Sequence, residues 1–187
     1  LAPHPVTGDI YLGGTGTVAN AAGTASNGSD GFISRFSASL ATRYAPIALP
    51  HWVKSLAYHG TNGDIYAAGK AYPVAWSAAA GGPQPTFAGG STDAFVARIN
   101  SGLTTINSAS FLGTTGDDQA FGIAISALTG NVFVVGEVRG ANLPGASVGA
   151  YPTINADNWD AFVTAFTAEL SNFGVTPNPF TIRPRLN

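Results

Sequence analysis

Hydrophobic and polar positions along this chain alternate in short runs that are typical of β-strands. The clearest run covers residues 118–126. Its side chains divide between two faces: Phe121, Ile123 and Ile125 on one, and Ala120, Gly122 and Ala124 on the other. Turn-forming residues at 128–131 come next, followed by a run at 131–137 that is apolar on both faces. Such a run predicts a strand that is covered on both sides.

The run at Gly130–Gly136 has two further copies. Its opening glycine recurs, so that Gly8, Gly63 and Gly130 begin three similar stretches of sequence. Each of these glycines lies between turn-forming residues, where glycine adopts positive φ at low cost. A second repeated block begins at Asp30, Asp93 and Asp160 and continues without gaps to Leu40, Leu103 and Leu170. The sequence therefore predicts a threefold structural repeat.

The sequence pattern within each repeat predicts a four-stranded antiparallel meander of about 60 residues. Besides the two runs above, strands are expected at 160–167 and, in the middle repeat, at 104–112. The predicted units are residues 1–50, 51–115 and 116–176, followed by an extended tail or linker at 177–187. A sandwich would give each strand one polar face, whereas radially stacked sheets bury both faces. We therefore expect an all-β fold, a partial β-propeller of three four-stranded antiparallel blades.

Several short motifs of the last two repeats resemble the bacterial seven-bladed β-propeller repeats known as SBBP repeats. The motifs are Phe111-Leu112-Gly113, Gly116-Asp117-Asp118, Gly130–Gly136, Gly149-Ala150-Tyr151-Pro152-Thr153 and Asp160-Ala161-Phe162-Val163. The resemblance covers residues 1–170 and is weaker in the first repeat, where residues 45–50 replace the corner motif. It implies a propeller in a secreted or surface protein, and it carries no shared catalytic residues.

The first repeat is incomplete at its start. Leu1 aligns with the middle of an inner strand, and three blades are fewer than the 4–8 that close a propeller. We therefore expect the chain to belong to a larger propeller, with further blades from a parent chain or from other subunits. The outward apolar face of the first blade, with Ile10 and Tyr11 near it, would then need a cover that this chain does not contain.

The composition favours a secreted, periplasmic or cell-surface protein. Charged residues make up 10% of the chain, against roughly 25% in a typical domain. Lys and Arg total 8 and form no basic run, so nucleic-acid binding has no evident electrostatic source. No apolar stretch approaches the roughly 20 residues of a membrane span. Cysteine is absent, which excludes disulfides and thiolate chemistry, and we expect no cofactor.

The polar candidates have both a functional and a structural interpretation. Asp117 and Asp118 could be calcium or sugar ligands, although capping of a turn is the favoured interpretation. Asp30, Asp93 and Asp160, one per repeat, are expected to bind backbone N–H groups before the third strand. The histidines are His4, His51 and His59, and a metal site would require them to converge with further ligands.

The loops at about 14–29, 70–92 and 137–159 are longer than ordinary hairpin loops. Their aromatic residues could stack on sugars or anchor a protein, or could fold back over blade edges. The candidate binding residues are Tyr72, Trp76, Tyr151 and Trp159. We found no catalytic set, so we expect a non-catalytic binding module for a protein or glycan. Two alternatives stay open: part of a propeller lyase or hydrolase with catalytic residues elsewhere, or a structural subunit of a surface assembly.

Overall fold

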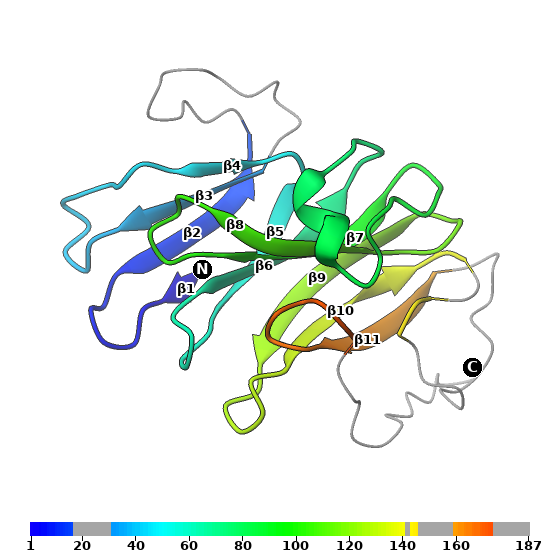
Figure 1. Ribbon diagram of the computed structural model, residues 1–187. Coiled ribbons are helices and arrows are strands. Elements are labelled where there is room, and N and C mark those ends of the chain that lie inside the picture. The colour runs from blue at the N-terminus through cyan, green and yellow to red at the C-terminus, as the bar shows by residue number, and fades with distance from the viewer. Residues whose placement is uncertain (17–30, 141–142, 146–158, 174–187) are drawn as a thin grey trace, which may run out of the picture.

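A computed structural model describes residues 1–16, 31–140, 143–145 and 159–173 as three antiparallel sheets (Figure 1). The first sheet contains β1 (Ala2–Pro3), β2 (Ile10–Thr15), β3 (Gly31–Phe36) and β4 (Ile47–Leu49). The middle sheet contains β5 (Trp52–Tyr58), β6 (Ile65–Ala71), β7 (Asp93–Ile99) and β8 (Ile106–Leu112). The third sheet contains β9 (Asp118–Ile125), β10 (Val132–Val138) and β11 (Asp160–Phe166). A short 3₁₀ helix, η1 (Ser77–Gly81), precedes β7.

Strands that follow one another in the chain are neighbours in each sheet, so every sheet is a meander. The prediction of an all-β fold with antiparallel sheets is confirmed. The described residues form no closed ring of sheets, so the propeller itself stays a prediction.

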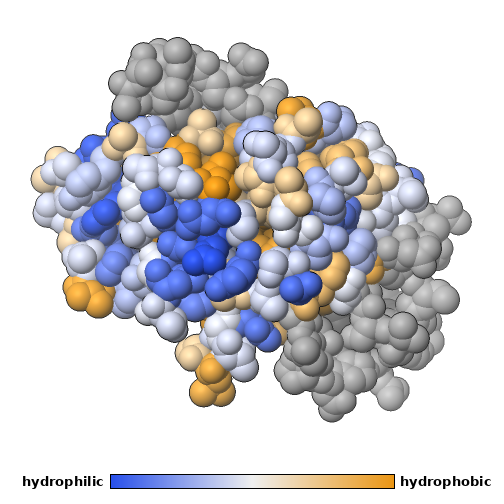
Figure 2. Space-filling view, in the orientation of Figure 1, coloured by the Kyte–Doolittle hydropathy of each residue, from blue (hydrophilic) through white to orange (hydrophobic). Residues whose placement is uncertain are grey.

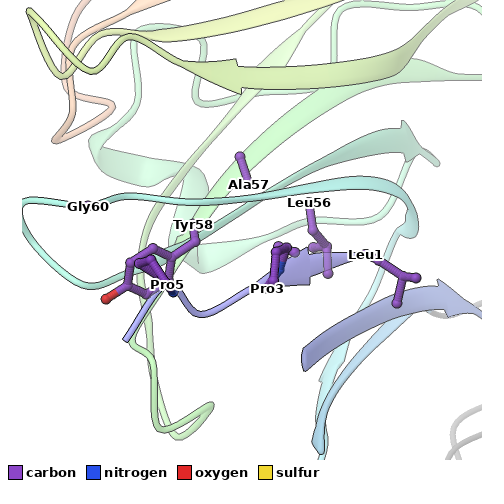
Figure 3. A pocket seen from close by; sticks show the side chains of 8 residues that line it. Leu1, Pro3, Pro5, Leu56, Ala57, Tyr58 and Gly60 are labelled. Atoms are coloured by element: carbon purple, nitrogen blue, oxygen red, sulfur yellow. The ribbon is translucent and has the colours of Figure 1, made fainter. Parts of the chain in front are cut away.

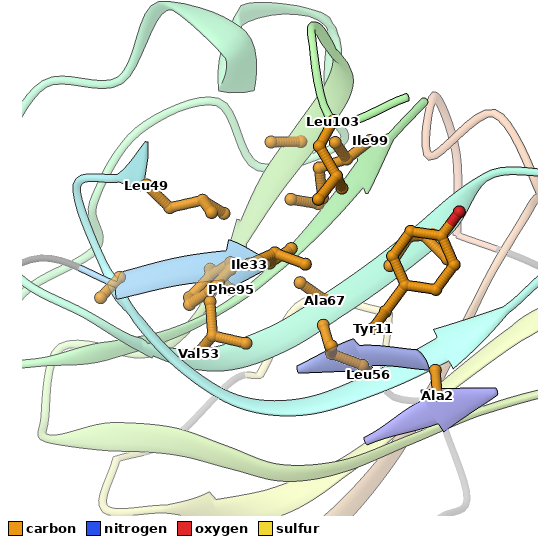
Figure 4. Packing of buried hydrophobic residues seen from close by; sticks show 14 of the residues in the cluster. Ala2, Tyr11, Ile33, Leu49, Val53, Leu56, Ala67, Phe95, Ile99 and Leu103 are labelled. Carbon is orange, nitrogen blue, oxygen red and sulfur yellow. The ribbon is translucent and has the colours of Figure 1, made fainter. Parts of the chain in front are cut away.

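The middle sheet lies between the other two and is buried on both faces. All of β6 and β7 is buried except Lys70 and Arg98. Alternate residues of these strands belong to separate cores. Ala67 and Phe95 pack with Tyr11 and Ile33 of the first sheet (Figure 4), whereas residues such as Tyr66 and Val96 pack with the third sheet. The double-sided apolar pattern of the repeat thus follows from stacking of sheets.

Tyr11 corrects one expectation from the sequence. It does not lie near an uncovered face: it is fully buried between the first and middle sheets, and its hydroxyl donates to the carbonyl of Ser101 over 2.9 Å. Tyr66, its counterpart in the middle sheet, donates in the same way to the carbonyl of Ala168 in the third sheet. The sequence shows that neighbouring strand residues face opposite ways, but not which side the next sheet occupies.

The third sheet departs from the predicted pattern at a β-bulge. The pairing of β9 with β10 shifts register between Val135 and Gly136, which leaves Phe121 without a partner residue. Phe121 therefore does not share a face with Ile123 and Ile125, as the alternation predicted: it is exposed, whereas the isoleucines pack against the core. Lys54 is the equivalent extra residue of β5, so the bulge recurs in the repeat.

The outer side of the third sheet is not covered by the described residues. Val132 and Val134 of β10 are buried, but Val135 on the opposite side is exposed, so the described residues cover only one side of this strand. A fourth strand is also expected in this unit, and of the residues that follow β11, Phe173 forms a single bridge with Phe166. Residues 174–187, including the predicted tail at 177–187, lie outside the described residues.

The turn glycines of the three repeats adopt the same backbone conformation. Gly8, Gly63 and Gly130 have φ of 72°, 77° and 71°, the left-handed region in which glycine is favoured. Each donates its N–H to the carbonyl four residues earlier, at 3.0, 2.9 and 2.9 Å. This recurring turn fixes the hairpin between the first two strands of every sheet.

An ion pair joins the second and third strands in two of the three sheets. Arg35 binds Asp9 in the first sheet, and Arg98 binds Asp64 in the middle sheet over 2.6 Å. Arg98 also reaches Glu169 of the third sheet at 3.1 Å. The equivalent residues of the third sheet are Asn131 and Ala165. Both partners are replaced together, which avoids leaving one charge alone in a partly buried position.

Candidate functional site

The loop between β6 and β7 folds back over its own sheet. Trp76 packs against Phe95 and Phe111, with ring centroids 5.6 and 6.3 Å apart. The carbonyl of Gln84 accepts the N–H of Phe111 over 3.0 Å, so the loop supplies a backbone partner to the edge strand β8. Trp76 is therefore occupied in packing, and this loop covers an edge, which was one of its two predicted roles.

The candidate binding residues that the structure describes do not come together. Tyr72 lies beside Trp52 at the end of β6, whereas Trp76 is partly buried and packs against the core between the first and middle sheets. Trp159 is exposed just before β11, and Tyr151 lies outside the described residues. Of the three that the structure describes, only Tyr72 belongs to a cluster that combines aromatic and charged side chains, so the candidate site is built from that residue.

The aromatic part of the candidate site is a pair of half-buried rings. Trp52 begins the inner strand β5, and Tyr72 directly follows β6, which pairs with β5. Their centroids are 5.4 Å apart at an interplanar angle of 73°, the edge-to-face arrangement that aromatic rings prefer. The Lys70 ammonium lies 6.0 Å from the Trp52 ring and 5.8 Å from the Tyr72 ring.

The orientation of Trp52 determines what it offers to a ligand. Its Nε1 is buried and has no hydrogen-bond partner among the described residues. The indole N–H is thus turned inward although the residue is half-buried as a whole. The accessible part of Trp52 is consequently its apolar ring, which suits stacking better than hydrogen bonding.

A chain of polar side chains joins Lys54, two residues after Trp52 in β5, to the third sheet. Lys54 Nζ donates to Gln119 Oε1 over 2.5 Å, and Gln119 Nε2 donates to Glu137 Oε1 over 2.5 Å. The Lys54 ammonium also lies 4.5 Å from the centre of the exposed Phe121 ring. These contacts arise because the edge strands β5 and β9 lie side by side, with the N–H of Ile123 donating to Ser55 Oγ.

We name these residues the Trp52 cluster, which consists of Trp52, Lys54, Lys70, Tyr72, Gln119, Phe121 and Glu137. The cluster contains charged groups of both signs. Partial burial lowers the pKa of Lys54, and the positive charge of Lys70 lowers it further, whereas the Glu137 carboxylate raises it. Burial also raises the pKa of the Tyr72 hydroxyl. The cluster therefore offers ring surfaces, two cationic donors, an amide and one carboxylate at the same end of the inner strands.

Asp93 and Asp118 form a separate buried corner. Asp93 is fully buried, and its Oδ2 accepts the N–H of Ala88 over 2.7 Å. Its Oδ1 has no hydrogen-bond partner among the described residues. Burial raises the pKa of Asp93 to about 7, and the charge of Asp118 adds to the shift while backbone donors oppose it. A Cβ on Gly113 would lie 2.4 Å from Asp93 Cγ, so backbone packs directly on the carboxylate.

The neighbouring aspartates also bind backbone. Asp118 accepts the N–H of Thr114 over 2.5 Å and that of Arg139 over 3.0 Å, and burial raises its pKa. Asp117 accepts the N–H of Ser91 over 2.5 Å. Asp30 lies outside the described residues, and Asp160 is half-buried at the start of β11. In the described chain, no three His, Asp or Glu residues are grouped closely enough to hold a metal ion.

The two equivalent histidines connect turns and sheets. His4 Nδ1 accepts the N–H groups of Val6 and Thr7, and His59 Nδ1 accepts those of Thr61 and Asn62. Because Nδ1 is an acceptor, Nε2 carries the proton. His59 Nε2 donates to the carbonyl of Gly130, and His4 Nε2 to the Tyr58 hydroxyl, both over 3.2 Å. His51 is buried against Trp76, Phe95 and Phe111.

Two shallow hollows lie elsewhere on the described surface. One, of about 350 Å³, separates β1 from β5, and no charged side chain lines it (Figure 3). The other, of about 370 Å³, lies beside Gly113 and Thr114. In Figure 2, hydrophilic residues gather over the area where Figure 1 labels β6 and β8. Neither hollow joins aromatic rings to charged groups as the Trp52 cluster does.

Comparison of the chain with known protein families finds no match, and comparison with curated proteins finds none either. Within the described residues, the structure contains no helix whose length and apolar character would let it cross a membrane.

Sequence reasoning identified Tyr72 but missed most of the cluster. Trp52 and Lys70 are separated by a whole hairpin in the chain and are direct partners across β5 and β6. Gln119 and Glu137 are paired in the same way across β9 and β10. The alignment of repeats places these two pairs at equivalent positions of successive units. That equivalence could have indicated that they share one end of neighbouring sheets.

Proposed function

We propose that this chain is a non-catalytic binding module on a β-propeller scaffold, and that it binds a glycan at the Trp52 cluster. The observation that carries the proposal is the half-exposed Trp52–Tyr72 pair beside Lys70, whose charge interacts with that of Lys54. Sugar rings present apolar C–H faces that stack on aromatic rings, and hydroxyl groups that bond to charged side chains.

In this proposal, each side chain has a separate role. The Trp52 and Tyr72 rings form the platform on which one sugar stacks. Lys54 and Glu137, joined through Gln119, bind hydroxyl groups of the same or the next sugar. The low content of charged residues, 10%, supports a secreted, periplasmic or cell-surface location.

Two observations support the scaffold part of the proposal. One is the resemblance to SBBP repeats, and the other is the stacking of three meander sheets that share one repeat. Because the sheets stack face to face, their inner strands β5 and β9 lie side by side. In a propeller, these strands would line the axis, and the cluster would lie at one mouth of it.

Binding can be tested with a panel of neutral and acidic oligosaccharides, using a glycan array followed by calorimetry. Trp52→Ala should weaken binding by roughly tenfold or more, because a loss of about 1.4 kcal/mol, within the range of aromatic contacts, corresponds to a factor of ten. Trp159→Ala is the matched control, since that tryptophan is exposed outside the cluster. Glu137→Gln, which preserves shape, should also weaken binding.

Two results would contradict the proposal. One is the absence of binding to every glycan on the panel by the folded wild-type protein. The other is equal loss of affinity in the Trp52→Ala and Trp159→Ala variants, which would show that the cluster does not form the platform. Binding to a protein but to no glycan would assign the module a protein partner instead.

A further inference from the structure

The two internal junctions of the molecule are built in the same way. We call the side of a sheet that faces the preceding sheet its back face, and the opposite side its forward face. The forward face of the first sheet presents Tyr11 and Ile33 to the back face of the middle sheet. The forward face of the middle sheet presents the equivalent Tyr66 and Val96 to the third sheet. One kind of contact therefore joins successive repeats.

A leucine in the turn after the third strand takes part in each junction. Leu40, Leu103 and Leu170 occupy equivalent positions and have φ of 58°, 56° and 55°. This left-handed conformation costs roughly 1–2 kcal/mol for a residue other than glycine. Leu103 and Leu170 are 5% and 0% exposed because they insert into the back-face side of their junctions. Leu40 has the same strained geometry but is 63% exposed.

The described chain thus ends in two unfilled halves of the same junction. On the back face of the first sheet, Leu12 is 36% exposed in addition to Leu40. On the forward face of the third sheet, Val135 and Val163 are 41% and 39% exposed. Their equivalents in the middle sheet, Ala68 and Val96, are fully buried. The exposure of these side chains is therefore specific to the end sheets and does not belong to the repeat as such.

We propose that a second copy of this chain docks head to tail, with the forward face of its third sheet on the back face of the first sheet. Both complementary halves are present in one chain, so a copy supplies what each end lacks. Contacts of this heterologous kind close into a ring or continue as an open chain of copies. Two copies give six sheets, a number within the 4–8 blades of closed propellers. The proposal is independent of glycan binding.

Both internal junctions contain a tyrosine hydrogen bond that lacks its donor at the proposed junction between copies. Tyr11 and Tyr66 donate to the carbonyls of Ser101 and Ala168, whose equivalent in the first sheet is Ala38. The residue that would face Ala38 is Phe133, which lacks the hydroxyl. Phe133→Tyr should therefore tighten self-association by a few-fold to about tenfold, the effect of one net hydrogen bond.

The test is sedimentation of the whole chain over a range of concentrations. The wild type should associate into dimers or longer head-to-tail oligomers. Leu40→Asp, at a position where aspartate tolerates positive φ, and Val135→Asp should each yield monomers. Leu128→Asp is the matched control: Leu128 is 97% exposed, and its counterparts Thr61 and Val6 are exposed in their own turns. This control should leave association unchanged.

Mixing the two variants tests the head-to-tail arrangement. The Leu40→Asp protein retains an intact third sheet, and the Val135→Asp protein retains an intact first sheet, so an equal mixture should form heterodimers. A contact between identical faces would instead leave one variant dimeric on its own. A wild type that stays monomeric at about 100 μM, or association that survives both substitutions, would overturn the proposal.

Discussion

The buried carboxyl of Asp93 should make the stability of this protein depend on pH. Asp93 is fully buried, and one of its oxygens has no hydrogen-bond partner among the described residues. Burial raises its pKa from 3.8 to about 7, so the folded protein binds this proton more tightly than the unfolded chain does. The contribution of Asp93 to stability is therefore greatest below pH 4, falls between pH 4 and 7, and is constant above pH 7.

The magnitude follows from the size of the shift. A difference of about three pKa units, at about 1.4 kcal/mol per unit, corresponds to roughly 4 kcal/mol. Asp93→Asn removes the ionisation but keeps an oxygen that can accept the N–H of Ala88. The free energy of unfolding of the wild type should thus decrease by roughly 4 kcal/mol relative to this variant as the pH rises from 4 to 8.

Urea unfolding followed by tryptophan fluorescence, at half-unit steps of pH from 4 to 8, measures this difference directly. Other titrating groups are common to both proteins and cancel in the comparison, apart from those coupled to Asp93. Asp118 is coupled to Asp93, because its negative charge raises the pKa of Asp93. Asp118→Asn should therefore move the transition to lower pH without abolishing it. Parallel pH curves for wild type and Asp93→Asn would refute the reasoning.

Two further predictions concern the repeat. Arg35→Ala should lower the free energy of unfolding by about 2–3 kcal/mol, because it leaves the nearly buried Asp9 without its partner. Adding Asp9→Asn reproduces the pair Asn131 and Ala165 of the third sheet. This double variant should recover part of the lost stability in urea unfolding. A double variant that is no more stable than the single one would contradict this. Gly130→Ala should cost about 1–2 kcal/mol since φ is 71°, and its Cβ would lie 3.2 Å from His59 Nε2. Gly60→Ala, with nothing within 4 Å, should be nearly neutral in thermal unfolding, and equal shifts in Tm would count against the argument.

The amino-acid sequence alone determined the repeat, the strands and the turns between them. Strand positions follow from local alternation of apolar side chains, which depends only on the geometry of an extended chain. The turn glycines at 8, 63 and 130 follow from a local need for positive φ. The ungapped alignment also placed Leu40, Leu103 and Leu170 at equivalent positions, which share one strained turn in the structure.

Tertiary structure decided which side of each strand faces a neighbour. Tyr11 is buried because the middle sheet lies on its side of β2, and Phe121 is exposed because a bulge in β9 reverses the alternation. The Trp52 cluster joins side chains of two sheets, so no single repeat contains it. The raised pKa of Asp93 requires complete burial beneath Gly113 and proximity to Asp118. Stacking creates each of these features, and alternation within one strand cannot specify how sheets stack.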